Sequence, residues 1–181
     1  PIIARIARLL QGLGASPNGV SLAALGTGVA SAASVVSGSP RTGIALLWLS
    51  GLLDAVDGTL ARQVGGSPLG AIFDITFDRV VEIALIAALA WRHPAARFEL
   101  LLLAGAIAIA MSLFLAIAAA LQNRSFKAFH YAPGLGERTE AFIFLSVMIA
   151  DQHRLALWTG LFIGMILITM GQRLRHAARN G

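Results

Sequence analysis

The sequence predicts an all-α integral membrane protein, with six transmembrane helices and an N-terminal interfacial helix. Of its 181 residues, 57% are hydrophobic and only 13% are charged, whereas soluble domains contain about 25% charged residues. A transmembrane helix needs about 20 mostly apolar residues, so the chain has room for five or six of them joined by short loops. We therefore expect one membrane domain over residues 16–181, after a juxtamembrane segment of residues 1–15.

The first expected element is an interfacial helix at residues 2–13. Its apolar residues recur at helical spacing, and Arg5 and Arg8 fall on another face, as in helices that lie in the plane of a membrane surface. Gly14 and Pro17 then interrupt the pattern, which favours a separate helix over an extension of the first transmembrane helix.

The six expected transmembrane helices follow as apolar stretches separated by glycine, proline or charged residues. They lie at residues 20–36, 42–62, 69–91, 98–121, 141–150 and 155–174. The fifth stretch is too short for a bilayer unless its helix extends back through Glu140 and Glu137.

The basic residues predict the orientation. With six transmembrane helices both termini lie on one side, and nine basic residues fall there against four on the other. By the positive-inside rule, the termini and the loops after the second and fourth helices are cytoplasmic, as in a multi-pass protein of a bacterial or archaeal inner membrane. The basic residues form no stripe interleaved with aromatic residues, so nucleic acid is not an expected partner. Cysteine is absent, which excludes disulfides and thiol catalysis.

Acidic residues gather inside two of the apolar stretches. Five of the nine lie there, namely Asp54, Asp57, Asp74, Asp78 and Glu82. A carboxylate at the bilayer centre costs about 2.5 to 3.5 kcal/mol, so the group is expected to face a hydrated cavity and to be neutralised. Hard oxygen ligands in this number suit Mg²⁺ or Mn²⁺, and two such ions commonly hold a diphosphate during phosphoryl transfer.

The spacing places these acids on two helix faces. Asp54 and Asp57 lie three residues apart, and Asp74, Asp78 and Glu82 recur every four residues, so each set lines one face. The connection between the two stretches is rich in glycine and contains a proline, which favours a tight antiparallel turn. Four aspartates are therefore expected around one space.

Small residues and an arginine accompany the acids. Gly58, Ala61 and Gly70 would let a bulky ligand approach the backbone, and the Arg62 guanidinium suits a phosphate. The simplest alternative for each glycine is close packing between membrane helices.

Together these residues form a recognisable signature. The segment DAVDGTLAR at residues 54–62, seven further residues, and GAIFDITFD at residues 70–78 resemble the signature of the CDP-alcohol phosphotransferase family. All eight fixed positions match, and SPNGVSL at residues 16–22 looks like the family's segment before the first transmembrane helix.

The resemblance implies a role for each matched residue. Asp54, Asp57, Asp74 and Asp78 would bind two divalent ions, Mg²⁺ or Mn²⁺, and Asp78 would also deprotonate the acceptor hydroxyl. The CDP part would be held by Gly58, Ala61, Arg62 and Gly70, with Asn18 as a further candidate. The implied enzyme moves a phosphatidyl group from a CDP-alcohol such as CDP-diacylglycerol to an alcohol, releases CMP and acts in phospholipid biosynthesis. A homodimer is implied by the resemblance alone.

A second similarity concerns the acceptor. ERTE at residues 137–140 and QR at residues 172–173 look like the acceptor-phosphate region of family members that make phosphatidylinositol phosphate. Arg138 and Arg173, with Arg124 or Lys127 as a third cation, would then bind a phosphorylated polyol such as inositol phosphate or glycerol phosphate. A fuller motif has an arginine where this chain has Ala141. The alternative is that these cations only meet lipid headgroups.

Two other functions use acidic residues within membrane helices. An intramembrane prenyltransferase also holds a diphosphate through aspartates, but its two acidic motifs are well separated, whereas these lie in adjacent helices. A cation transporter also needs intramembrane carboxylates, but it does not account for the small residues and the arginine beside them.

Overall fold

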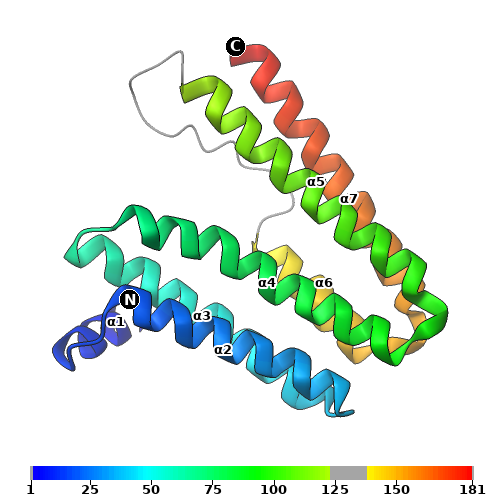
Figure 1. The fold of residues 1–181 in the computed structure, drawn as a ribbon, viewed down its shortest axis with the longest axis horizontal. Helices are drawn as coiled ribbons and strands as arrows, with labels where there is room; N and C mark the ends of the chain where they lie inside the picture. The colour runs from blue at the N-terminus through cyan, green and yellow to red at the C-terminus, as the bar shows by residue number, and fades with distance from the viewer. Residues whose placement is uncertain (1, 123–137, 181) are drawn as a thin grey trace. The chain divides into compact units, whose positions relative to one another are not determined.

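The computed structural model describes residues 2–122 and 138–180, and this part of the chain is helical with short connections (Figure 1). Its helices are α1 (Ile2–Gly12), α2 (Pro17–Val36), α3 (Pro40–Val64), α4 (Pro68–Arg92), η1 (Pro94–Ala96), α5 (Arg97–Gln122), α6 (Arg138–Ala150), η2 (Gln152–Arg154) and α7 (Leu155–Asn180). The predicted all-α fold is confirmed, and a helix is present at each of the six apolar stretches.

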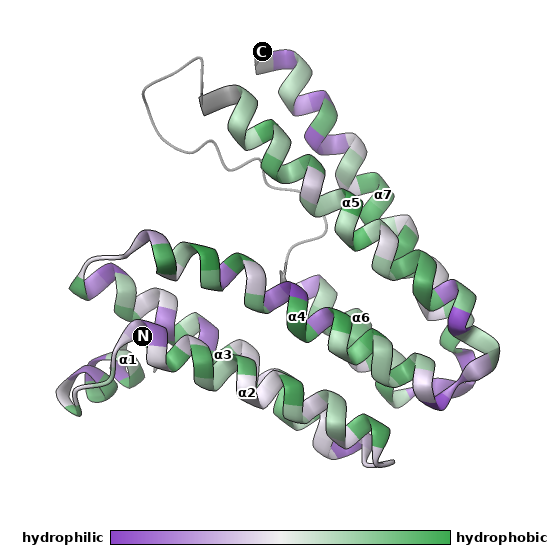
Figure 2. Cartoon of the chain, in the orientation of Figure 1, coloured by the Kyte–Doolittle hydropathy of each residue, from purple (hydrophilic) through white to green (hydrophobic). Residues whose placement is uncertain are grey.

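Four helical segments in the described residues are long and apolar enough to cross a membrane. They are α2, α3, the segment Pro94–Ala120 and the segment Gln152–Arg179. Figure 2 shows α5 hydrophobic along most of its length, whereas the C-terminal turns of α7 are largely hydrophilic. Helix α4 has 25 residues but carries charged side chains in its middle, and α6 has only 13 residues. Six spans were predicted, and four meet the requirements of length and composition.

The chain divides into two compact units, Pro1–Arg92 and His93–Gly181. In the first unit, α2 packs against both α3 and α4, and α1 packs against α3. In the second unit, α5 and α6 both pack against α7. The second unit also contains a hydrogen bond of 2.7 Å between His93 Nε2 and Gln152 Oε1, and a bond of 3.0 Å from Trp158 Nε1 to Asp151 Oδ2.

Small residues allow α2 to approach its two neighbours closely. Ser31 Oγ donates to the Gly43 carbonyl at 2.6 Å, and Ser50 Oγ donates to the Ala24 carbonyl at 2.7 Å. A Cβ atom added to Gly28 would lie 2.8 Å from Val81 Cγ1 and 3.0 Å from Ser50 Oγ. Small residues and hydroxyl groups of this kind favour close packing between membrane helices.

We expect Gly28→Ala to destabilise the protein by about 1 to 3 kcal/mol, because its Cβ would overpack the contact between α2 and α4. Gly26→Ala is the matched control, because a Cβ atom there meets nothing within 4 Å. Thermal unfolding of both variants in detergent measures the difference. Equal unfolding temperatures for the two variants would show that α2 and α4 move apart to admit the added methyl group at little cost in stability.

Helix α1 uses part of its apolar surface against the protein. Ala7 is fully buried against Val56 and Leu60 of α3, while Leu9 and Leu13 are 69% and 83% exposed. The buried side of α1 was not expected from its amphipathic pattern, because periodicity does not distinguish a face that packs on another helix from one that packs on lipid. The predicted position of α1 at the membrane surface remains a prediction.

Candidate active site

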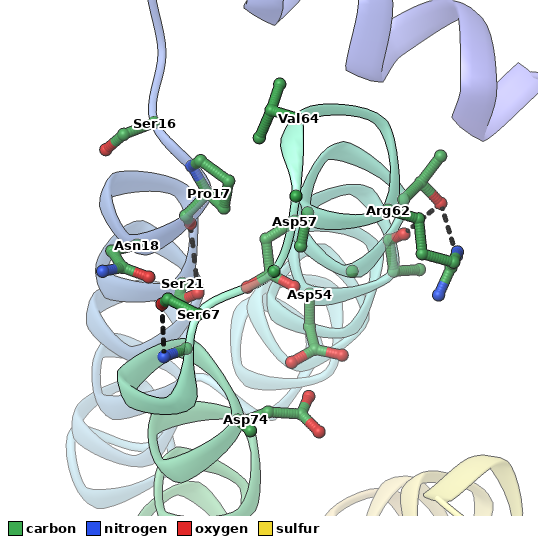
Figure 3. A pocket seen from close by; sticks show the side chains of 18 of the residues that line it. Ser16, Pro17, Asn18, Ser21, Asp54, Asp57, Arg62, Val64, Ser67 and Asp74 are labelled. Atoms are coloured by element: carbon green, nitrogen blue, oxygen red, sulfur yellow. Dashed lines mark hydrogen bonds between the residues drawn. The ribbon is translucent and has the colours of Figure 1, made fainter. Parts of the chain in front are cut away.

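A cavity of about 670 Å³ lies within the first unit. It is lined by residues of α1, α2, α3, α4 and the α3–α4 connection, and Figure 3 shows it from close by. The lining includes eight of the residues that the sequence singled out: Asn18, Asp54, Asp57, Gly58, Ala61, Arg62, Gly70 and Asp74. The structure therefore brings most of the predicted metal and nucleotide residues to one space.

The α3–α4 connection explains how two stretches of the chain share this cavity. Helix α3 ends at Val64, and Gly65 follows with a φ of +92°, a conformation that glycine adopts with little strain. Pro68 opens α4, and the Ser67 hydroxyl accepts a hydrogen bond from the Gly70 amide at 3.0 Å, as an N-cap residue does. The predicted tight turn is confirmed.

Three carboxylates reach the cavity from the two helices. Asp54 and Asp57 come from α3 and Asp74 comes from α4, and in Figure 3 Asp54 and Asp74 approach each other from facing helices. Asp57 is only 5% exposed. A buried carboxylate is costly unless it is paired with a hydrogen-bond donor or a cation.

Asp78 lies one helical turn beyond Asp74 on α4 and is not among the residues that line the cavity. Its carboxylate is nevertheless within electrostatic range of Asp74 and Asp57. The arrangement in the structure is thus three aspartates at the cavity with a fourth beside them, rather than the expected four around one space. The turn brings α3 and α4 together at the connection, while α2 packs against both.

The donor chemistry of the cavity fits a divalent cation, because the three aspartates offer hard carboxylate oxygens at a cavity whose other lining residues include a single charged side chain, Arg62. In the part of the chain that the structure describes, no three aspartate, glutamate, histidine or cysteine side chains lie close enough together to hold one metal ion. Ligation by three of the aspartates would therefore require these side chains to move closer together.

Ser21 is a site residue that the sequence analysis did not single out. It is 8% exposed and lines the cavity from α2. Its hydroxyl donates to the Pro17 carbonyl at 3.1 Å and lies near the Asp57 carboxylate. Ser21 follows Asn18 by three residues, which places both on one face of α2. This spacing within SPNGVSL was the available signal.

Several of the predicted nucleotide-binding residues lie close to one another or to a neighbouring side chain. A Cβ atom on Gly70 would be 3.3 Å from Asn18 Oδ1, so glycine permits the close approach of α4 to the Asn18 side chain. Arg62 Nη2 donates to Thr59 Oγ1 at 3.0 Å, and a Cβ atom on Gly58 would lie 3.7 Å from Arg62 Nη1. The guanidinium thus lies along its own helix at the edge of the cavity.

The three acceptor candidates are placed less completely. Lys127 and its alternative Arg124 lie outside the described residues. Arg138 opens α6, and its side chain also falls outside the described part. The Arg173 guanidinium of α7 lies 5.0 Å from the centre of the Phe114 ring, a cation–π distance. Arg138 and Arg173 belong to the second unit and the aspartates to the first, so a shared acceptor site remains a prediction.

Comparison with known proteins identifies relatives of this chain. A family model described as CDP-alcohol phosphatidyltransferase matches residues 15–170. A bifunctional IPC transferase and DIPP synthase of Rubrobacter xylanophilus is 40% identical over 76 residues, which are 41% of this chain and 17% of that protein. A phosphatidylinositol phosphate synthase of Corynebacterium glutamicum is 35% identical over 92 residues, which are 50% of this chain and 42% of that protein. The aligned regions therefore span less than half of either relative.

Solved structures show a similar fold. The phosphatidylinositol phosphate synthase of Mycobacterium tuberculosis with CDP-DAG bound gives a TM-score of 0.72 at 26% identity, covering 97% of this chain and 93% of that one. The same enzyme in complex with manganese and citrate gives a TM-score of 0.76 at 24% identity, covering 97% and 88%. The second likeness shows the fold alone.

Proposed function

The chain belongs to the CDP-alcohol phosphatidyltransferase family, and we propose that it transfers a phosphatidyl group from a CDP-alcohol to the hydroxyl of an acceptor alcohol and releases CMP. The observation that carries the proposal is the cavity in which Asp54, Asp57 and Asp74 lie beside Gly58 and Gly70. Acidic groups that would bind metal and small residues that would admit a nucleotide thus share one space.

The proposed donor is CDP-diacylglycerol or a similar CDP-lipid. The relative from Mycobacterium tuberculosis binds CDP-DAG in its solved structure. The cavity of about 670 Å³ lies in the range of small-molecule sites. We assign Gly58, Ala61, Arg62 and Gly70, with Asn18, to the CDP part, because all five line this cavity.

The proposed cofactor is a pair of divalent ions, Mg²⁺ or Mn²⁺. The phosphatidylinositol phosphate synthase of Mycobacterium tuberculosis has been solved in complex with manganese and citrate, and in this chain Asp54, Asp57, Asp74 and Asp78 are the residues that would hold the ions. When bound, divalent cations neutralise phosphate charge and stabilise the attacking and leaving oxygens of an in-line displacement.

The chain's own residues would carry the proton transfer. Asp78 accepts the proton of the acceptor hydroxyl while the oxygen of that hydroxyl attacks the β-phosphorus of the donor. A new P–O bond forms to the acceptor, and the bond between the β-phosphorus and the bridging oxygen breaks. The electron pair of that bond leaves with CMP, so no covalent enzyme intermediate is needed.

The proposed acceptor is a phosphorylated polyol, inositol phosphate or glycerol phosphate. A relative with 35% identity over half of this chain is a phosphatidylinositol phosphate synthase, and Arg138, Arg173 and Lys127 supply cations for a phosphate. We further propose that the active site and both termini lie on the cytoplasmic side of the membrane and that the protein acts as a homodimer.

One assay tests this function against the alternatives. Purified protein is incubated with Mn²⁺ or Mg²⁺, CDP-diacylglycerol labelled in its cytidine, and a panel of phosphorylated and free alcohols, and CMP is measured. We expect CMP release that depends on the acceptor. A prenyltransferase or a cation transporter would leave the CDP-lipid intact with every alcohol in the panel.

Asp54→Asn and Asp78→Asn are expected to separate binding from proton transfer. Asp78→Asn should lose turnover but retain CDP-diacylglycerol affinity within about tenfold, because a base acts on the acceptor, whereas Asp54→Asn should weaken donor binding more strongly. Equilibrium binding of the labelled donor at fixed Mn²⁺ compares the two variants. Equal losses of affinity would make Asp78 a metal ligand and no base.

Arg138→Ala and Arg173→Ala are expected to raise the acceptor KM about ten- to a hundredfold while donor affinity stays nearly constant. Each would remove a charged hydrogen-bonding partner of the acceptor phosphate, typically worth about 1.5 to 3 kcal/mol. Acceptor saturation curves with inositol phosphate and free inositol measure the effect. If free inositol is the better substrate, or if neither variant changes the KM, the arginines serve only as topological charges.

A further inference from the structure

The turn of α4 that follows Asp78 contains a buried ion pair. Glu82 is only 2% exposed, and it is held by Arg79, whose Nη2 donates to Glu82 Oε1 at 2.8 Å. Arg79 Nη1 also lies 2.8 Å from Glu82 Oε2, although this contact lacks the alignment of a hydrogen bond. The side chain of Arg79 is 34% exposed. The pair thus joins a buried carboxylate to an arginine whose side chain is partly exposed.

Stability alone does not account for this pair. Removing two charges from water is costly, and apolar residues of similar volume in place of a buried ion pair are often as stable or more stable. In a helix that is apolar from Ile83 to Trp91, a leucine in place of Glu82 would share a face with the buried Leu85 and Leu89. A functional role therefore explains the presence of both charges better than stability does.

The geometry leaves one edge of the guanidinium with a nitrogen that has no partner in the described part of the protein. Both terminal nitrogens face the Glu82 carboxylate, so the contact is end-on. Nε is buried and has no hydrogen-bond partner among the described residues. The edge formed by Nε and the neighbouring terminal nitrogen presents two parallel N–H donors, the arrangement that matches two oxygens of a phosphate.

The position of this edge connects it to the reaction. Arg79 directly follows Asp78, the proposed base, and its charge acts on the Asp78 carboxylate. A cation here lies next to a row of acids that would otherwise repel a phosphate. A phosphate bound by Arg79 would therefore be held beside the group that accepts the proton.

We propose that Arg79 binds a phosphate group of one of the two substrates through the edge that contains Nε, and that Glu82 is the positioning residue that fixes this edge. The inference rests on the proposed function. The phosphate has two possible sources, the diphosphate of the CDP-lipid and the phosphate of the acceptor. The same chemistry recognises both, and the kinetic experiment distinguishes them.

The principal variant is the double substitution Arg79→Leu with Glu82→Leu, which removes both charges and leaves no buried charge unpaired. We expect its unfolding temperature to stay at or above that of the wild type and its kcat/KM to fall about ten- to a hundredfold. A rise in the KM for CDP-diacylglycerol assigns Arg79 to the donor, and a rise in the KM for inositol phosphate assigns it to the acceptor.

Two single variants complete the test. Arg79→Lys keeps the charge and loses the planar fork, so it should raise the same KM while remaining folded. Glu82→Gln should raise that KM as well, because it loosens the guanidinium without removing it. If the double variant does not fold, the KM values of Arg79→Lys alone test the proposal.

The matched control is Arg92→Leu in the same helix. Arg92 Nη1 donates to the Val36 carbonyl at 3.3 Å, at the opposite end of α4 from the cavity. This variant should lower the unfolding temperature without changing either KM. A general weakening of α4 would alter the unfolding temperature, whereas loss of a phosphate contact alters a KM.

Unchanged KM values, within twofold, in Arg79→Lys and in a folded double variant would overturn this inference and leave the proposed function intact. A double variant that loses activity only in proportion to its unfolding would also overturn it. A wild-type protein that releases no CMP with any acceptor would overturn the proposed function together with this inference.

Discussion

Replacing Asp57 with asparagine is expected to lower the rate of CMP release at least about hundredfold while the protein stays folded. Asp57 is 5% exposed and lines the cavity from α3. Because this position is buried, the carboxylate of an exposed neighbouring residue cannot take its place. Substitution of groups that only support a metal ligand typically costs about 10- to 100-fold in activity, and loss of a ligand itself should cost at least as much. Asparagine keeps the shape of the side chain but removes the charge.

Asp151→Asn is the matched control, since it makes the same chemical change outside the cavity, where the carboxylate accepts a hydrogen bond from Trp158. Initial rates of CMP release at saturating donor and acceptor, together with thermal unfolding, compare the two variants with the wild type. Asp151→Asn should retain its rate within about twofold. A similar rate in Asp57→Asn would exclude Asp57 from the catalytic machinery.

Removal of divalent cations is expected to abolish turnover completely, and Mg²⁺ or Mn²⁺ is expected to restore it. Without cations the carboxylates of Asp54, Asp57 and Asp74 would repel a diphosphate that enters the same cavity. The effect should exceed that of any single substitution, because chelation removes every ion at once. It should also be reversible, unlike the consequences of unfolding.

The measurement is a titration of CMP release after treatment with a chelator, followed by stepwise addition of Mg²⁺, Mn²⁺ or Ca²⁺. Thermal unfolding of the chelated protein provides the control for structural damage. The expected curve falls to the background rate in excess chelator and recovers with Mg²⁺ or Mn²⁺. Full activity in excess chelator would contradict a metal-dependent mechanism.

Much of the fold and of the site was predictable from particular residues. Proline and glycine marked the helix ends, so the expected stretches 42–62 and 69–91 match α3 and α4 to within two residues at each end. The start of α6 at Arg138 shows the backward extension of the fifth stretch past Glu140, whereas Glu137 lies outside the described residues. The spacing of Asp54 and Asp57 with Gly58 correctly predicted a shared face, because side-chain direction on a helix follows directly from sequence separation.

Other features depend on tertiary packing, which the periodic pattern does not encode. The role of α2 as the common neighbour of α3 and α4 places Ser21 next to Asp57, and only contacts between distant segments reveal this. Similarly, the burial of Ala7 against α3 could not be separated from burial in lipid. The charged residues near Asp78 explain why α4 does not meet the composition requirement for a transmembrane helix.

The most direct test of the central claim is the stoichiometry of the reaction. Wild-type protein with Mn²⁺, CDP-diacylglycerol and inositol phosphate is sampled over time, and CMP and the lipid product are quantified in the same samples. Phosphatidyl transfer predicts one CMP for each molecule of phosphatidyl-linked acceptor, with neither product formed when the acceptor is omitted. Release of CMP without a phosphatidyl product would show that the protein hydrolyses the donor, and an unchanged CDP-lipid would contradict the proposed transfer altogether.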